Sequence, residues 1–285
     1  MLSVHIKAPI GAPAEDVWAL ARDFNGLPRW VPGIVGSRLE GDGIGATRHL
    51  TIKWRGDQWA AEKLESFDER RFHMTYSIVD STLPVKTYLS SFRLLPADDG
   101  KSCILDWSAE FEANNASAGE AKNFVAGAYR AGLYRLRGLF MDKWDRRYLD
   151  VADLAAEWSK DPRAKVGAVV ADRHRRVVAL GYNGFAVGVE DSIDRLYDRD
   201  QKLDLMVHAE QNAMLIAGRN AEQGTIYVAG KPVCSRCAGV IIQAGIKRVV
   251  GEWPADPASK WFKPGHIAIQ MFEEASLEYV HISRD

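Results

Sequence analysis

The sequence predicts two domains, the first with an α+β fold over residues 1–140 and the second with an α/β fold over residues 141–285. Three observations carry this prediction. The chain has 285 residues, which is enough for two ordinary domains, each with its own core. Strand-like runs fill the first half and end in one long amphipathic helix, which is typical of α+β folds. Helices and strands alternate in the second half, as they do in α/β folds with layered sheets.

The elements of the first domain follow from turn residues and hydrophobic periodicity. A helix over residues 13–22 starts at a proline and carries Val17, Leu20 and Ala21 on one side. A longer helix follows the last strand, because apolar residues recur at steps of three to five from Phe124 to Phe140. Turns rich in Gly, Asp and Pro separate the predicted strands, which span residues 3–8, 47–54, 72–79, 86–95 and 103–111.

The stretch IKAPIGAPAEDVWALARDFNGLPRWVPGI combines a strand, a helix and a Trp-Val-Pro segment. In this layout, residues 1–140 resemble the polyketide cyclase/START-like family. The resemblance implies a helix-grip fold, in which a curved antiparallel sheet surrounds the long C-terminal helix and encloses an apolar cavity. We therefore expect an apolar ligand in this domain. The alternative is that its tryptophans simply fill the core; they are Trp18, Trp30, Trp54, Trp59 and Trp107.

The second domain is predicted to alternate between helix and strand. The predicted helices span residues 144–158, 207–217 and 237–244, and the predicted strands span residues 165–172, 176–182, 225–229 and 248–252.

Composition and charge exclude several classes of protein. The formal net charge is −1, so no broad basic field predicts binding to nucleic acid. No run approaches eighteen apolar residues, so no transmembrane helix is expected. The first residues lack the basic start and apolar stretch of a signal peptide, so we expect a cytoplasmic protein. Three cysteines do not make a disulfide framework, and a Cys-x-x-Cys pair then indicates metal or redox chemistry.

Four residues of the second domain predict a catalytic zinc site. His208 and Glu210 lie in VHAEQNAM, and Cys234 and Cys237 lie in KPVCSRC. Zinc prefers sulfur and imidazole ligands, and a catalytic zinc keeps one position open for water. His-x-Glu followed by Pro-Cys-x-x-Cys is the signature of zinc-dependent base deaminases. We therefore predict that His208, Cys234 and Cys237 bind Zn²⁺, and that Glu210 moves protons.

The cysteine pair has two other interpretations. A structural zinc site needs a fourth protein ligand, which His266 or His281 could supply, although we expect both on the surface. A redox pair leaves His208 and Glu210 without a role. The third cysteine, Cys103, is expected to be buried and inert in a strand of the first domain.

Four phrases of the second half, SKDPRAKVGAVVAD, GYNGFAVGVED, VHAEQNAM and CSRCAGVIIQAGIKRVV, resemble the deoxycytidylate deaminase family. The resemblance implies a three-layer cytidine-deaminase-like fold and an oligomer of identical chains. It also implies that Asn183 contacts the sugar of a nucleotide. The backbone of Val166, Gly167 and Ala168 then lines the base pocket, and the N–H of Ala209 reads the pyrimidine. For Asn183 an equal alternative is structural, because Asn-Gly is a common turn.

The chain departs from this family at two places. Val233 stands where the family often has a proline immediately before the first cysteine, which should shift the loop without removing a ligand. Residues 203–207 contain no aromatic side chain, although the family often has one shortly before His-Ala-Glu. Arg195, Arg199 and Lys202 are candidate phosphate contacts, and each is alternatively a solvated surface charge.

The sequence predicts a zinc-dependent hydrolytic deaminase of a cytosine nucleotide, with dCMP as the expected substrate. A second hypothesis keeps the chemistry but changes the substrate to a modified pyrimidine or another amino-heterocycle. A third hypothesis is a ligand-binding sensor whose deaminase domain is an inactive scaffold, which the intact set of His208, Glu210, Cys234 and Cys237 argues against.

Overall fold

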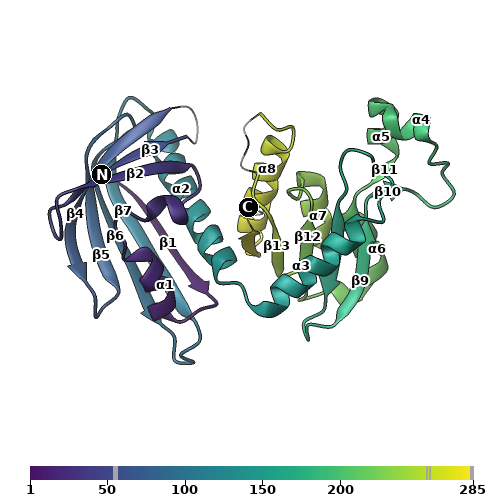
Figure 1. Cartoon of the computed structure of the whole chain (residues 1–285), viewed down its shortest axis with the longest axis horizontal. Coiled ribbons are helices and arrows are strands. Elements are labelled where there is room, and N and C mark those ends of the chain that lie inside the picture. Colours follow the sequence, from purple (N-terminus) through teal and green to yellow (C-terminus); the bar gives the residue numbers. More distant parts are fainter. Residues whose placement is uncertain (54–56, 255, 257, 283–285) are drawn as a thin grey trace. The chain divides into compact units, whose positions relative to one another are not determined.

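The computed structural model describes residues 1–53, 57–254, 256 and 258–282. The chain forms two compact units, Met1–Phe140 and Met141–Asp285, which are described separately (Figure 1). Within the described ranges, we find no helix with the length and apolar character needed to cross a membrane.

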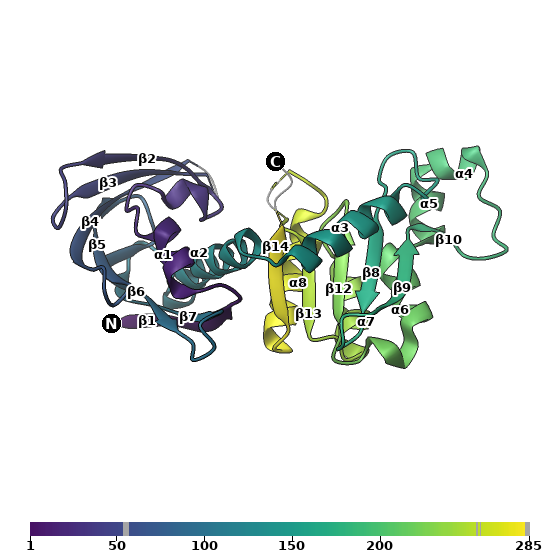
Figure 2. The same cartoon turned by 60° about the horizontal axis from the view of Figure 1, so that its bottom comes forward.

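Seven strands of the first unit form one curved antiparallel sheet in the order β1-β7-β6-β5-β4-β3-β2 (Figures 1 and 2). Helix α1 (Ala14–Ala21) and the short turn η1 (Leu27–Arg29) connect the first two strands. The strands are β1 (Leu2–Ile10), β2 (Ile34–Glu40), β3 (Thr47–Ile52), β4 (Gln58–Asp68), β5 (His73–Ser81), β6 (Val85–Pro96) and β7 (Cys103–Ala113).

The long helix α2 (Ala118–Leu139) follows the last strand of this sheet and packs against β1 and β7. It begins with a capping box, because the Ser117 side chain accepts from the Glu120 N–H and the Glu120 carboxylate accepts from the Ser117 N–H. Near its other end, Arg137 donates to the Pro9 carbonyl at 3.0 Å. The predicted helix-grip fold is therefore confirmed.

The five predicted strands correspond to β1, β3, β5, β6 and β7, although Trp54, at the end of one predicted range, lies outside the described residues. Two further strands were missed. Bulges at Ala61/Glu62 and at Leu64/Ser66 shift the phase of β4, so its sequence does not alternate regularly. Strand β2 is an edge strand with mostly exposed residues, and it therefore has little hydrophobic pattern.

The second unit contains a five-stranded sheet in the order β14-β13-β12-β8-β9. Its strands are β8 (Gly167–Ala171), β9 (Val177–Tyr182), β12 (Thr225–Ala229), β13 (Arg248–Glu252) and β14 (Glu278–Ile282), and a small separate pair is formed by β10 (Gly184–Phe185) and β11 (Met206–Val207). Its helices are α3 (Lys143–Ala156), α4 (Ile193–Tyr197), α5 (Arg199–Leu205), α6 (Ala209–Ala217), η2 (Gly218–Ala221), α7 (Ser235–Gln243) and α8 (Phe262–Glu274).

Helices lie on both faces of this sheet, as Figure 2 shows. Gly167 faces α3, since a Cβ atom there would lie 1.9 Å from the Ala152 carbonyl oxygen. Gly181 faces α6 instead, and it pairs with Ala168, the next residue of β8. Because successive residues of a strand point to opposite faces, α3 and α6 cover opposite faces of the sheet. The predicted three-layer α/β architecture is confirmed.

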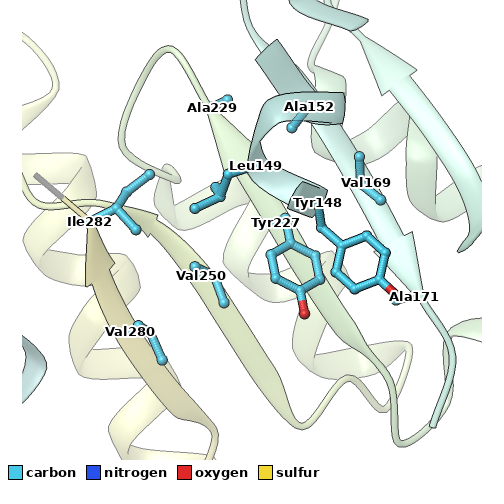
Figure 3. Packing of buried hydrophobic residues seen from close by; sticks show 10 residues of the cluster. All are labelled: Tyr148, Leu149, Ala152, Val169, Ala171, Tyr227, Ala229, Val250, Val280 and Ile282. Atoms are coloured by element: carbon cyan, nitrogen blue, oxygen red, sulfur yellow. The ribbon is translucent and has the colours of Figure 1, made fainter. Parts of the chain in front are cut away.

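The core on the α3 face joins Tyr148, Leu149 and Ala152 of this helix to apolar side chains of four strands (Figure 3). The remaining members come from alternate positions of the sheet: Val169, Ala171, Tyr227, Ala229, Val250, Val280 and Ile282. This packing extends across β14, which together with α8 was missed by the sequence analysis. The sequence therefore predicted the centre of the sheet and missed one edge.

Candidate active site

Two helix N-termini of the second unit carry the residues of the predicted zinc site. His208 is the N-cap of α6, and Cys234 is the N-cap of α7, where Cys237 occupies the first turn. The free N–H groups of a helix start carry partial positive charge, which favours thiolates and other anions nearby. The fold therefore brings the three candidate ligands to one point, although Cys234 and Cys237 follow His208 by 26 and 29 residues along the chain.

The three candidate ligands have the geometry of a metal site. The Nδ1 atom of His208 lies 3.5 Å from the Cys234 sulfur and 3.3 Å from the Cys237 sulfur. All three ligand atoms lie within 4.8 Å of one another. Tetrahedral zinc, with Zn–S about 2.3 Å and Zn–N about 2.0–2.1 Å, separates sulfur from nitrogen by about 3.6 Å. Both the spacing and the donor set therefore fit a zinc ion.

Within the described ranges, this metal-ligating group contains three protein residues and no fourth. His266 instead stacks its ring edge-on against Trp253 at 5.3 Å and against Phe262 at 4.4 Å. His281 is 7% exposed, so its expected place on the surface is wrong: β14 carries it into the core of the unit. The set of three ligands matches a catalytic zinc site with an open position, and a structural site lacks its fourth ligand here.

The two thiols and the imidazole interact as one hydrogen-bonded group. A hydrogen bond with Cys237 lowers the pKa of the Cys234 thiol to about 4. The same interaction, together with burial, raises the pKa of Cys237. A hydrogen bond with Cys234 raises the pKa of His208. The group thus already holds one thiolate, and a metal ion bound there would replace the remaining protons.

Glu210 lies in the first turn of α6 beside these ligands, but it is not a member of the metal-ligating group. The residue is 4% exposed, and its burial raises the pKa of its carboxyl group. A carboxyl group with a raised pKa accepts and releases protons closer to neutral pH than an exposed one. This environment suits a proton shuttle.

A cavity with an empty volume of about 550 Å³, part of it open to solvent, adjoins the metal-ligating group. His208, Ala209 and Glu210 line one part of it. Its other lining residues are Asp161, Ala164, Val166, Asn183, Lys202, Leu203, Met206, Lys231, Pro232, Lys260 and Trp261. We call this space the metal-site cavity.

Asn183 lines the metal-site cavity and also holds its wall together. Its side-chain oxygen accepts from the Val166 N–H at 2.8 Å, and its side-chain nitrogen donates to the Ala164 carbonyl at 2.9 Å. Its backbone carbonyl accepts from the Ser159 hydroxyl at 2.8 Å. The structural role that we kept as an alternative for Asn183 is therefore present, and it is compatible with a contact to substrate.

Other predicted contacts are divided between the cavity and more distant positions. Val166 and Ala209 line the cavity, whereas Gly167 and Ala168 are not among its lining residues. The two are buried in β8, where Gly167 contacts α3 on one face and Ala168 pairs with Gly181. The wall of the cavity therefore begins at Val166, one residue before the strand.

The three predicted phosphate contacts also differ from one another. Arg195 lies outside the lining and donates to the Glu190 carbonyl at 3.0 Å, and Arg199 also lies outside it. Lys202 lines the cavity, but its ammonium group lies 3.0 Å from the Asp161 carboxylate, and its side chain is 12% exposed. Lys202 is thus a partly buried charge paired with Asp161, and the alternative of a solvated surface charge does not describe it.

Lys231, Lys260 and Trp261 are among the lining residues of the cavity that were not predicted from the sequence. Lys231 stands three residues before Cys234 and could have been noted from this proximity. Trp261 precedes α8, and its ring lies 6.2 Å from the His208 ring at an interplanar angle of 64°. No local pattern connects Trp261 to the metal ligands, because the chain crosses β13 before it returns to the cavity.

The first unit contains a second, mostly apolar cavity with an empty volume of about 600 Å³, part of it open to solvent. Trp107 contributes to its wall, whereas Trp18 and Trp30 are buried elsewhere in the core and Trp59 is 43% exposed. One charged residue, Glu62, faces the cavity, and the Arg48 guanidinium donates to it at 2.7 Å. Nearby, the hydroxyl groups of Tyr88 and Tyr129 are 2.6 Å apart.

Two known families match this chain. Residues 1–140 match the family described as polyketide cyclase / dehydrase and lipid transport. Residues 142–252 match the family described as cytidine and deoxycytidylate deaminase zinc-binding region.

Individual relatives give the extent of the similarity. An uncharacterized deaminase in luxG 3'region of Aliivibrio fischeri is 39% identical over 146 residues, which cover 51% of this chain and 97% of that protein. The deoxycytidylate deaminase of Homo sapiens is 38% identical over 114 residues, which cover 38% of this chain and 64% of that protein. Among solved structures, XoxI from Bacillus cereus is 32% identical, with 50% of this chain and 97% of that chain covered and a TM-score of 0.47.

Proposed function

Because this chain belongs to the cytidine and deoxycytidylate deaminase family and is a hydrolytic deaminase, we propose that it converts dCMP and water into dUMP and ammonia. The observation that carries this proposal is the buried Glu210 carboxyl group beside the group of His208, Cys234 and Cys237, at the wall of one cavity. Of the curated relatives, several are deoxycytidylate deaminases by name, and the matched segment spans 64% of the human one.

The residues of the site divide the chemistry between them. His208, Cys234 and Cys237 would hold the zinc ion, which supplies Lewis acidity and lowers the pKa of water to about 7 when it is bound. Glu210 accepts a proton from the attacking water and delivers it to N3 of the cytosine ring. It then takes the proton of the hydroxyl group formed at C4 and transfers it to the exocyclic amino group, so that the C4–N bond breaks, the C4 carbonyl forms and ammonia leaves. The burial that raises the pKa of Glu210 suits it to both transfers.

Ammonia release by purified, zinc-analysed protein tests this proposal directly. We expect turnover of dCMP, with cytidylate, deoxycytidine, cytidine and cytosine as comparison substrates. Glu210→Gln should retain zinc and lose at least about 100-fold in kcat, because proton transfer of this kind contributes about 10²–10⁴-fold. Ammonia from another amino-heterocycle, with dCMP untouched, would instead support a substrate outside the cytosine nucleotides.

The metal assignment has its own matched controls. Cys237→Ala should lose zinc and lower the unfolding temperature of the second unit, because it removes one of three ligands. Cys103→Ala is the control, since Cys103 lies in β7 of the first unit and is 1% exposed. Zinc content measured by plasma emission should fall in the first variant only. Full zinc occupancy in Cys237→Ala would contradict the ligand assignment.

We also propose that the cavity of the first unit binds an apolar ligand. Its mostly apolar wall favours such a ligand, and the Glu62 carboxylate offers one acceptor for a donor group. The neutral probe N-phenyl-1-naphthylamine should bind with a rise in fluorescence. Ala128→Phe should abolish this rise, because Ala128 lines the cavity and the larger side chain fills it. Unchanged binding in that variant would place the probe elsewhere.

We further propose that the protein is a homo-oligomer that assembles through its deaminase unit. Leu215 and Ile216 of α6 are 78% and 67% exposed, and apolar side chains this exposed favour burial against a second copy. Light scattering should give a multimer for the natural protein and a monomer for the variant with Leu215→Glu and Ile216→Glu. A monomeric natural protein would refute the proposal.

A further inference from the structure

Lysines supply most of the charge at the metal-site cavity. Lys202, Lys231 and Lys260 line it, together with the acidic residues Asp161 and Glu210. Lys202 is neutralised, because its ammonium group lies 3.0 Å from Asp161 and both side chains are largely buried. The Asp161 carboxylate also accepts backbone N–H groups of its own turn. This pair holds the cavity wall together and leaves no free charge for a ligand.

The other two lysines remain available. Among the described residues, neither Lys231 nor Lys260 has a carboxylate within ion-pair distance. Lys231 is partly buried beside Pro232, and Lys260 is exposed. The two approach the cavity from separate segments, one before α7 and the other before α8. Two unpaired cations beside one cavity attract an anionic group.

Trp261 stands next to these lysines in the cavity wall. The ammonium group of Lys260 lies 5.3 Å from the centroid of the Trp261 ring, and this ring lies 6.2 Å from that of His208. Trp261 therefore borders both the basic side of the cavity and the metal-ligating group. An indole ring in a cavity wall provides an apolar face on which a flat heterocycle can stack.

We propose that Lys231 and Lys260 bind the phosphate group of the substrate and that Trp261 packs against its heterocycle. The inference rests on the proposed deaminase function and makes the substrate an anionic nucleotide in preference to a nucleoside or a free base. It also assigns the phosphate contact to Lys231 and Lys260 in place of Arg195, Arg199 and Lys202, because these two lysines line the cavity and have no carboxylate within ion-pair distance in the described part of the chain. The segment that carries Lys260 and Trp261 lies beyond residue 252, where the deaminase family match ends.

Steady-state kinetics with dCMP and deoxycytidine test the lysines. Lys231→Met and Lys260→Met should each lower kcat/KM for dCMP about 10-fold, the value of one charge-assisted hydrogen bond, with a much smaller change for deoxycytidine. The preference for dCMP should therefore collapse in the double variant. Lys263→Met is the matched control, since Lys263 is exposed on α8 and does not line the cavity. An equal loss in Lys263→Met would overturn the assignment.

Trp261 is tested by a conservative pair of variants. Trp261→Ala should lower kcat/KM about 10-fold for both substrates, because both lose the stacking surface. Trp261→Phe should restore most of the activity, since a phenyl ring keeps an aromatic face. Equal activity of Trp261→Ala and the natural protein would remove Trp261 from the binding site.

Equilibrium binding separates this inference from the proposed reaction. Calorimetry should detect dUMP binding to the zinc-loaded natural protein, and this binding should weaken with salt and with loss of either lysine. Lysine-dependent dUMP binding without dCMP turnover would keep the anion site and reject the proposed substrate. Turnover of dCMP, with dUMP binding unaffected by both lysine changes, would keep the proposed substrate and reject the anion site.

Discussion

Gly181 of β9 lies so close to Ala209 of α6 that a Cβ atom on Gly181 would stand 2.3 Å from the Ala209 carbonyl oxygen. It would also lie 2.5 Å from the Ala213 nitrogen. The contact fixes the first turn of α6 against the sheet, and this turn presents Glu210 and follows His208. The position of these predicted site residues therefore depends on a glycine that belongs neither to the candidate ligands nor to the lining of the metal-site cavity.

Gly181→Ala should displace α6 and disturb the site. Overpacking of a close contact costs about 1–3 kcal/mol, and the shift should also lower zinc occupancy. Gly239→Ala is the control, because Gly239 lies in α7 and its nearest neighbour to a new Cβ atom is 3.8 Å away. Thermal unfolding and zinc content measure both effects. Identical zinc occupancy in the two variants would show that α6 tolerates the displacement.

Asn183→Ala should destabilise the second unit by about 1–3 kcal/mol, because it leaves the Val166 N–H and the Ala164 carbonyl without their partner. Asn183→Asp keeps an acceptor for Val166 and removes the donor to Ala164. The free energy of unfolding, measured with denaturant, and kcat/KM should therefore both decrease in the two variants. A loss of kcat/KM at unchanged stability would indicate that the main role of Asn183 is a direct contact with substrate.

Removal of the metal should expose one reactive cysteine. The pKa of Cys234 is lowered to about 4 by its hydrogen bond with Cys237, whereas burial raises the pKa of Cys103 to about 11. Iodoacetamide should therefore modify Cys234 in chelator-treated protein at neutral pH and spare Cys103. Added zinc should protect Cys234. Peptide mass spectrometry should detect the modification of Cys234 and its protection by zinc. Modification of Cys103 before Cys234 would contradict the expectation.

Asp172 should make stability depend on pH in the acid range. A hydrogen bond from the Arg176 side chain lowers the pKa of Asp172 from 3.8 to about 2. As the pH rises, the carboxyl group therefore loses its proton at a lower pH in the folded protein than in the unfolded chain. Its contribution to the free energy of unfolding is complete above pH 3.8 and is lost as the pH falls toward 2. The difference in Tm between the natural protein and Asp172→Asn should be constant at pH 5–7 and narrow below about pH 4. A difference that is constant down to pH 3 would exclude this linkage.

Much of the fold was predictable, because strong local patterns mark its elements. Strand β12 and helix α3 were placed to within two residues at each end. The same approach failed at β4, whose bulges break the alternation, and at β14, whose burial depends on pairing with β13. These elements are determined by partners that are distant in sequence, and local patterns carry little information about such partners.

The sequence by itself determined the two-domain layout and the deaminase chemistry, and it predicted His208, Glu210, Cys234 and Cys237 as the site residues, because the chemistry demands these residue types at close spacing within short motifs. Tertiary structure alone decided what surrounds them. It paired Lys202 with Asp161 and brought Lys231, Lys260 and Trp261 to the cavity. The physical reason is that the charge available to a ligand depends on which side chains meet in space, and no spacing along the chain records these meetings.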